Sequence, residues 1–241
     1  MTKFDKNLIL SKNPWLADVI ILQESASTQG DAKSGNANSL FLTDHQTAAY
    51  GRFGREYFTP SQGGIYMSAN LGPIDRENPV QYTLLAAAAL VSAIEKLTQK
   101  KPRIKWVNDI YLDGKKMAGI LAESNASAII LGIGFNFSIN EFPGELADRA
   151  TSLFKDETAS ISASSLVAEI WSEFDRLRAS ADYLKLYKAH CFVLGQSVSF
   201  SQNNKEYQGV ASDLTEHGEL VVDCTDGIQR ILNSGEISLM K

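Results

Sequence analysis

Short apolar runs alternate with polar segments through the first 140 residues, and this pattern predicts a β-sheet. The runs are rich in β-branched side chains and are bounded by Gly, Pro, Asn or Asp, as strands usually are. Between two of them, Asp113-Gly114 is a typical hairpin turn. The predicted strands are 19–22, 40–44, 65–71, 103–107, 110–112, 116–123 and 128–134.

Two longer segments have the three-to-four-residue apolar spacing of helices. The first follows Asn78, a favourable N-cap, and Pro79, which suits the first helical position, and we expect it to run to about Lys100. Its alanine run at 86–89 would let it pack closely on a sheet. The second is 164–190. Several strands with few helices between them indicate an α+β domain with a mixed sheet.

After Phe192 the pattern changes to very short strands separated by Asn, Asp and Gly turns, which predicts a small β-barrel. The predicted barrel strands are 198–200, 206–210, 219–222 and 228–231. We therefore expect two domains, 1–190 and 191–241.

Composition and charge narrow the class of protein. The 241 residues carry 23 Lys plus Arg against 28 Asp plus Glu, and a net charge of −5 argues against a protein that coats nucleic acid. Cys191, Cys224 and the three histidines are too scattered for a disulfide framework or a zinc site. The apolar run 84–91 is far shorter than the roughly 18 residues of a membrane span, and charges interrupt the N-terminal segment. We expect a cytoplasmic protein that binds neither membrane nor nucleic acid.

Two segments carry side chains that suit an anionic ligand. Gly51-Arg52-Phe53-Gly54-Arg55 combines glycines, which allow close approach, with arginines that match phosphate or carboxylate oxygens. The segment 105–109, together with Lys116, offers two ammonium groups, the amide of Asn108 and the carboxylate of Asp109, which could hold Mg²⁺. Taken alone, the loop is more often a solvated turn, and the second segment is equally well an ordinary charged hairpin.

Other motifs give weaker signals. Gly132-Ile133-Gly134 lacks the third glycine and the helix start of a dinucleotide site, so a tight strand crossing is the simpler interpretation. Ser27 and Thr28 can cap a helix that starts near Gln29, or offer hydroxyls to a small polar ligand. The sequence has no G-x-S-x-G elbow, Walker loop or kinase signature, which removes the usual support for hydrolases and P-loop enzymes.

The order of the segments is more informative than any one of them. Along the chain come Ser27-Thr28, Gln46-Thr47-Ala48 before the Gly/Arg loop, 105–109, 116–121, 132–136 and the ending Gly235-Glu236-Ile237-Ser238-Leu239. Over about residues 19 to 240, this order resembles the biotin protein ligases. The resemblance implies a mixed-sheet, class II synthetase-like biotin/lipoate ligase catalytic domain followed by an SH3-like β-barrel. It implies a short form without an N-terminal DNA-binding domain, because only about 20 residues precede the first strand.

The resemblance also implies an ATP-dependent ligase that works in two steps. Biotin and MgATP would form biotinyl-5′-adenylate, and biotin would then pass to a lysine of a biotin carboxyl carrier domain. The substrates would be biotin and ATP with Mg²⁺, and the partner would be the carrier protein of a biotin-dependent carboxylase. Dimerisation through the sheet edge occurs in the family, so a homodimer is compatible with it.

The motifs assign roles to individual residues by resemblance. Lys116, Arg52 and Arg55 would be catalytic, and Asp109 would handle Mg²⁺. The biotin-binding residues would be Ser27, Thr28, Gln46, Gly51, Arg52, Lys116 and Gly119. The ATP-binding residues would be Arg55, Tyr57, Asn108, Lys116 and Asn136.

The loop departs from the family pattern Gly-Arg-Gly-Arg-x-Gly-Arg-x-Trp. Ala49, Tyr50 and Tyr57 stand where that pattern has a glycine, an arginine and the tryptophan. Without the arginine at position 50, the loop could retain the adenylate less well or be less ordered.

Two other functions stay open. One is a lipoate or octanoate ligase or transferase of the same fold, and the other is a biotin-binding module with weakened catalysis. The polar set Ser27, Thr28 and Gln46 suits a ureido ring better than an acyl chain. Intact Lys116 and Asp109 favour catalysis over binding alone.

Overall fold

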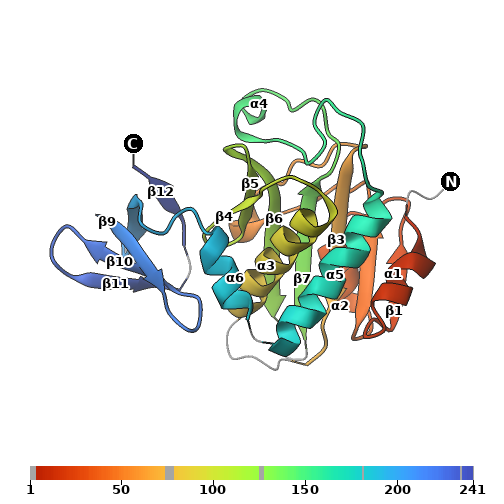
Figure 1. Ribbon diagram of the computed structural model, residues 1–241, viewed down its shortest axis with the longest axis horizontal. Coiled ribbons are helices and arrows are strands. Elements are labelled where there is room, and N and C mark those ends of the chain that lie inside the picture. The colour runs from red at the N-terminus through yellow and green to blue at the C-terminus, as the bar shows by residue number, and fades with distance from the viewer. Residues whose placement is uncertain (1–3, 74–78, 125–127, 181, 234, 241) are drawn as a thin grey trace.

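The computed structural model describes residues 4–73, 79–124, 128–180, 182–233 and 235–240. It contains a seven-stranded sheet with helices on both faces and, beside it, a smaller five-stranded sheet formed by the C-terminal residues (Figure 1). This arrangement confirms the α+β class and the separate C-terminal β-structure that the sequence predicts.

The large sheet has the strand order β1-β2-β3-β7-β6-β5-β4. β1 and β2 are parallel, and all other neighbours are antiparallel, so the sheet is mixed. The β5–β6 hairpin turns at Asp113 (φ 51°) and Gly114 (φ 78°), the left-handed conformation that an Asp-Gly turn favours. Its strands are β1 (Asp18–Ile21), β2 (Ser39–Thr43), β3 (Gly64–Asn70), β4 (Arg103–Lys105), β5 (Asp109–Leu112), β6 (Lys115–Ser124) and β7 (Ile129–Asn136).

Helices α3 (Pro79–Leu97), α5 (Ala163–Ser180) and α6 (Tyr183–His190) cover one face of this sheet (Figure 1). The alanines at 86–89 are fully buried in α3, as the predicted close packing requires. Among the described residues, α3 is the one helix long and apolar enough to cross a membrane, but 67% of that window is buried inside the protein. Its apolar surface is therefore used by the core.

Three details differ from the expectations. The segment 164–190 forms the two helices α5 and α6 rather than one. The strongly apolar positions 65, 67, 69 and 71 alternate in the sequence and predict a half-exposed strand, but β3 is buried along its whole length because both faces of this central strand are covered. The sequence patterns also missed two short helices, α1 (Lys6–Lys12) and α4 (Leu146–Arg149). The N-cap expected at Asn78 lies outside the described residues.

The small sheet is antiparallel, in the order β11-β10-β9-β8-β12, so the last strand returns to pair with the first. Before it, Cys191 still bridges to Ile104 of the large sheet. The boundary expected between residues 190 and 191 stays a prediction. The strands are β8 (Ser197–Gln202), β9 (Lys205–Leu214), β10 (Leu220–Cys224), β11 (Gln229–Leu232) and β12 (Ile237–Leu239).

Glu173 of α5 is the buried charge that joins the two long helices. Its side chain is 2% exposed and accepts hydrogen bonds from Arg176 and, across the helix interface, from Ser92 and Lys96 of α3. Burial alone opposes ionisation, but the bonds from Arg176, Lys96 and Ser92 outweigh it and lower the pKa of Glu173 to about 2.

We expect Glu173→Gln to destabilise the fold by about 2 kcal/mol at neutral pH, because the partners of the carboxylate lose their charge pairing. A lowered native pKa contributes stability above the unfolded value of 4.5, and this contribution disappears as pH falls toward 2. Urea unfolding at pH 7, 4 and 3 should show the difference between wild type and variant shrinking with acidification. Glu157→Gln, at an exposed pair with Lys100, is the control. A difference that is constant with pH would contradict the assignment.

Candidate active site

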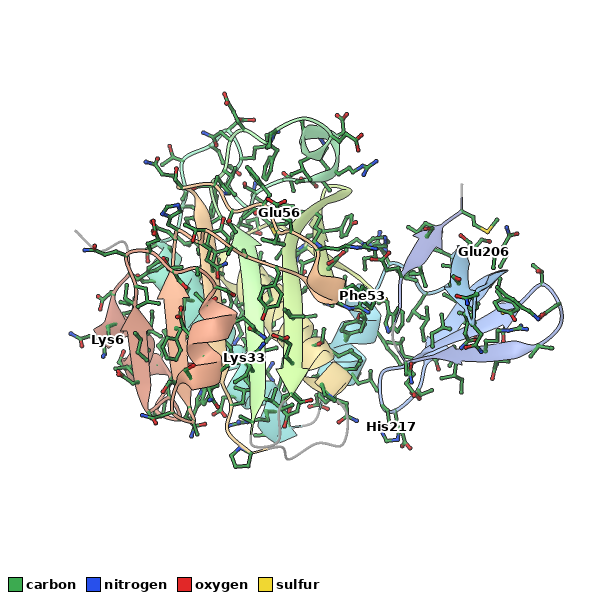
Figure 2. All side chains as sticks on the ribbon, turned by 180° about the vertical axis from the view of Figure 1, so that it is seen from behind. Lys6, Lys33, Phe53, Glu56, Glu206 and His217 are labelled. Atoms are coloured by element: carbon green, nitrogen blue, oxygen red, sulfur yellow. The ribbon has the colours of Figure 1, made fainter. Side chains whose placement is uncertain are left out.

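A cleft of about 680 Å³ opens on the face of the large sheet that carries α2 (Thr28–Ser34), opposite α3. This volume is in the range of small-molecule sites. Its walls come from α2, from the middle of β3, β6 and β7, from the loop 49–57, and from 235–238 at the start of β12. Figure 2 views this face, with Lys33 on α2 and Phe53 on the loop. Segments far apart in sequence therefore meet around one cavity.

One end of the cleft is polar and uncharged. Gln46 Oε1 accepts hydrogen bonds from the Thr28 backbone N–H (2.6 Å) and Thr28 Oγ1 (3.2 Å). Thr28 Oγ1 also lies 2.9 Å from Ser68 Oγ of β3. Ser27 precedes α2 as its N-cap, yet its side chain makes no capping hydrogen bond, so the hydroxyl remains available to the cleft that it lines. The cap position was predicted correctly, while the capping bond was not.

The floor of the cleft consists of glycines on neighbouring strands. Gly119 of β6 lies directly across from Gly134 of β7, and Gly132 is two residues further along. A Cβ at Gly134 would come within 2.8 Å of the Tyr57 ring, and one at Gly132 within 2.5 Å of Gln29 Oε1. Gly132 and Gly134 therefore make room over β7 for the side chains of Gln29 and Tyr57. This role within a strand differs from that of the glycines in a dinucleotide-binding motif, which the sequence did not favour.

The β5–β6 hairpin carries an ion pair into the cleft. Lys116 Nζ lies 2.6 Å from Asp109 Oδ1, and their side chains are 35% and 23% exposed. A register shift between Ile110 and Tyr111 disturbs the regular pairing of the hairpin at this point. The ammonium group is thus held at the cleft wall by a carboxylate on the neighbouring strand.

The loop 49–57 places a second cation over the cleft. Arg52 donates from Nη1 to Asn108 Oδ1 and from Nη2 to the Gly235 carbonyl, both at 3.1 Å. Burial lowers the pKa of this guanidinium, and the charges of Asp109 and Glu236 oppose the effect. Arg55 pairs through both terminal nitrogens with Glu236. Both arginines therefore join the loop to the C-terminal segment.

Tyr57 closes the loop onto the cleft floor. Its hydroxyl donates to the Gly134 carbonyl at 2.9 Å, and burial raises its pKa far above the ordinary value, so the phenol stays neutral. Asn136, by contrast, is not among the residues that line the cleft. Its buried amide donates to the Thr151 carbonyl at 3.0 Å, which holds the chain that follows β7.

The other site residues proposed from the sequence all line this cleft, and the structure adds several to which the sequence patterns assigned no role. Ser68 was visible only as a polar residue within an apolar strand. Trp106 donates from its indole N–H to the Gly218 carbonyl (3.0 Å), which links the cleft wall to the C-terminal sheet. The further lining residues include Gln29, Met67, Tyr111, Ile133, Leu146, Arg149 and Glu236.

A resident metal centre does not fit the described residues, which contain no group of three or more His, Cys, Asp or Glu side chains close enough to hold an ion. Asp109 is one carboxylate beside two cations. Mg²⁺ that arrives bound to a phosphate ligand needs only one or two protein carboxylates, and this arrangement would suit it.

The fold and the cleft define a biotin/lipoate ligase-type protein, and comparisons with known proteins specify the branch. Residues 21–140 match the model of the biotin/lipoate A/B protein ligase family, and residues 193–240 match the biotin protein ligase C-terminal domain. The chain belongs to the biotin protein ligase family.

Relatives and solved structures agree with this assignment. The chain is 31% identical to the bifunctional ligase/repressor BirA of Bacillus subtilis, over 89% of this chain and 71% of that protein. It is 27% identical to the biotin–[acetyl-CoA-carboxylase] ligase of Mycobacterium tuberculosis, over 90% and 87% of the two chains. The biotin protein ligase of Aquifex aeolicus in complex with biotin and ATP superposes with a TM-score of 0.80 at 29% identity, covering 94% of this chain and all of that one.

The glycine floor gives a direct test of the cleft geometry. We expect Gly134→Ala to cost about 1–3 kcal/mol of stability, because the new methyl group overlaps the Tyr57 ring and both it and β7 are held by neighbours. Urea unfolding measures the change. Gly30→Ala in α2, where a Cβ meets nothing within 4 Å, is the matched control and should be neutral or stabilising. Equal effects at the two positions would show that Tyr57 does not occupy this place.

Proposed function

We propose that this protein is an ATP-dependent biotin protein ligase that forms biotinyl-5′-adenylate and transfers biotin to a lysine of a carboxyl carrier domain. The observation that carries the proposal is the division of the cleft into a neutral polar end and a cationic end. Biotin has the same division, with a neutral ureido ring and an anionic carboxylate. The neutral side chains of Thr28, Gln46 and Ser27 suit the ureido ring, and the cations Lys116 and Arg52 suit the carboxylate.

The first step joins two anions. A biotin carboxylate oxygen attacks the α-phosphorus of ATP, a new C–O–P linkage forms, and the bond to pyrophosphate breaks. Lys116 and Arg52 would offset the repulsion between carboxylate and phosphate and the charge that builds on the transferred phosphorus, while Arg55 and Asn108 would hold the nucleotide. Mg²⁺ would supply further charge neutralisation of the triphosphate, with Asp109 as its protein ligand.

The second step releases AMP. The neutral amine of an acceptor lysine attacks the activated carbonyl, an amide forms as the nitrogen releases one proton to water, and AMP leaves with the electron pair of the broken bond. The remaining assignments follow the lining of the cleft. Gly51 and Gly119 would lie against biotin and Tyr57 against the nucleotide, while Asn136, which does not line the cleft, would act on the ATP site through the segment it holds.

The acyl substrate and the partner follow from the same site. A lipoate or octanoate chain would place apolar groups against the Thr28–Gln46 end of the cleft. Binding would then be weakened, because polar groups there would be shielded from water without a partner in the ligand. The match to a C-terminal domain of biotin protein ligases also favours biotin. The partner would be a biotin carboxyl carrier domain, and the outer strand β1 would be the surface for a homodimer, because the edge of β4 at the other end of the sheet is already bridged at Ile104 by Cys191.

ATP–pyrophosphate exchange tests the function directly. With purified protein and Mg²⁺, we expect exchange in the presence of biotin and none with lipoate, octanoate or no acid. The exchange isolates the first step and needs no acceptor protein. Exchange with lipoate or octanoate would assign the chain to the other branch of the fold, and biotin binding without exchange would make it a binding module.

Lys116→Ala should reduce the exchange rate by about 10²–10³-fold, as expected for removing one charge from the reacting centre. The matched control is Lys115→Ala on the same strand, whose ammonium group instead donates to the Ala147 carbonyl at 2.8 Å. Circular dichroism and thermal unfolding would confirm that both variants keep the fold. Wild-type exchange in Lys116→Ala, or an equal loss in Lys115→Ala, would contradict the role of Lys116.

A further inference from the structure

Tyr50 stands at the base of the loop that carries Arg52 and Arg55, and its hydroxyl meets two charged side chains. Lys33 Nζ of α2 donates to the Tyr50 hydroxyl at 3.1 Å, and that hydroxyl donates to Glu123 Oε2 of β6, also at 3.1 Å. Lys33 and Glu123 form an ion pair with each other at 3.1 Å. The three side chains therefore close a triangle that joins the loop, a helix and a strand.

The triangle satisfies the hydrogen-bonding capacity of the phenol in both directions. Its oxygen accepts from the ammonium group while its proton is given to the carboxylate, an arrangement that the opposite charges of Lys33 and Glu123 reinforce. The Lys33 ammonium also lies 5.7 Å from the centre of the Tyr50 ring. A phenylalanine in this place could keep the ring contact but neither hydrogen bond.

Backbone hydrogen bonds connect Tyr50 to the part of the loop that carries Arg52 and Arg55. Tyr50 bridges to Glu56, the Gly51 N–H donates to the Arg55 carbonyl at 2.8 Å, and the Tyr57 N–H donates to the Ala49 carbonyl at 3.2 Å. Within the turn so closed, Phe53 and Gly54 adopt left-handed conformations (φ 60° and 69°). Residues 51–56 thus form a closed turn whose base is held at Tyr50.

The tip of the turn needs such an anchor, because it has little packing of its own. Phe53 is 68% exposed and lies at the face of the large sheet, on the side nearer to the C-terminal sheet (Figure 2). On its side toward β6, the turn borders a shallow hollow lined by Leu121 and Glu123 rather than a packed layer. The position of Arg52 over the cleft therefore depends on its own bonds to Asn108 and Gly235 and on how firmly the base of the turn is held.

We infer that Tyr50 is a positioning residue, whose hydroxyl, held between Lys33 and Glu123, fixes the 51–56 turn over the cleft before any ligand binds. It takes over the ordering of a loop that has tyrosine where the family pattern has arginine. This inference rests on the proposed function for its consequence, the retention of biotinyl-5′-adenylate, but the anchoring itself does not require that function.

Hydrogen exchange in the ligand-free protein tests the anchor. In Tyr50→Phe, the amides of the peptide covering 51–57 should exchange about three- to tenfold faster, because the hydroxyl contacts that oppose opening of the turn are lost. Peptides from α3 and α5 serve as the internal reference. Tyr207→Phe in β9, whose ring packs on Phe200, is the matched control and should leave the 51–57 peptide unchanged. Unchanged exchange in Tyr50→Phe overturns the inference.

Swapping the two charges tests whether Lys33 and Glu123 are the partners that hold the Tyr50 hydroxyl. Lys33→Met and Glu123→Gln should each accelerate exchange of the same peptide, whereas the double variant Lys33→Glu with Glu123→Lys restores both an ion pair and a donor and acceptor for the phenol. Restored slow exchange in the double variant supports the triangle. Exchange that stays fast there, with thermal unfolding unchanged, overturns the assignment to these two side chains.

Release of the intermediate tests the consequence. Wild type and Tyr50→Phe would be loaded with labelled biotin and MgATP, and the loss of bound label would be followed by gel filtration. We expect release to be about three- to tenfold faster in the variant, in proportion to its hydrogen exchange. Equal release at faster exchange overturns the link to retention. If the wild type forms no adenylate, the proposed function fails, while the exchange result still decides the anchor.

Discussion

The large sheet has to pack tightly on one face and stay open on the other, and the rest of the molecule follows from that constraint. On the packed face, the alanines of α3 bring a helix close to the strands without leaving voids. On the open face, Gly119, Gly132 and Gly134 remove the side chains that would otherwise fill the middle of β6 and β7. Gln29 and Tyr57 take part of the room above these glycines, and the remainder forms the cleft between α2, the loop 49–57 and the sheet.

The cations of the cleft are held by partners that an anionic ligand can replace. Lys116 is paired with Asp109, Arg55 with Glu236, and Arg52 with the neutral oxygens of Asn108 and Gly235. Lys116 and Arg52 are partly buried, and such charges are costly unless they are paired, so their contacts hold these two cations in place, whereas the Arg55–Glu236 pair is exposed and contributes little. When a carboxylate or phosphate enters the cleft, its oxygens replace the protein oxygens that bind these cations. The positive charge is therefore already in place when negative charge develops.

The sequence was sufficient for the parts of the structure that are local. The structure confirms three predictions that depend on neighbouring residues alone. These are the Asp113-Gly114 hairpin, the strands of the large sheet and the series of short strands after Phe192. The burial of β3 could not be read from its pattern, because it depends on which strands lie beside it. Ser68 and Gln29 carry no motif, and they reach the cleft only because β3 and α2 converge there. Gly235, one of the two partners of Arg52, and Glu236, the partner of Arg55, lie more than 180 residues away in the sequence, beyond any local pattern.

These distant contacts make the C-terminal sheet part of the cleft. Gly235 and Glu236 bind the two arginines of the loop, and Gly218 accepts the indole N–H of Trp106 on the opposite side of the same region. Without these residues, the guanidinium of Arg55 would lose its carboxylate and Arg52 one of its two acceptors, so the tip of the loop would be held only through the bond from Arg52 to Asn108. The triangle of Tyr50, Lys33 and Glu123 and the C-terminal contacts therefore hold the same turn from its two ends. A loop restrained at both ends costs less conformational entropy to close on a ligand than a free one, which favours retention of a reactive intermediate in the cleft.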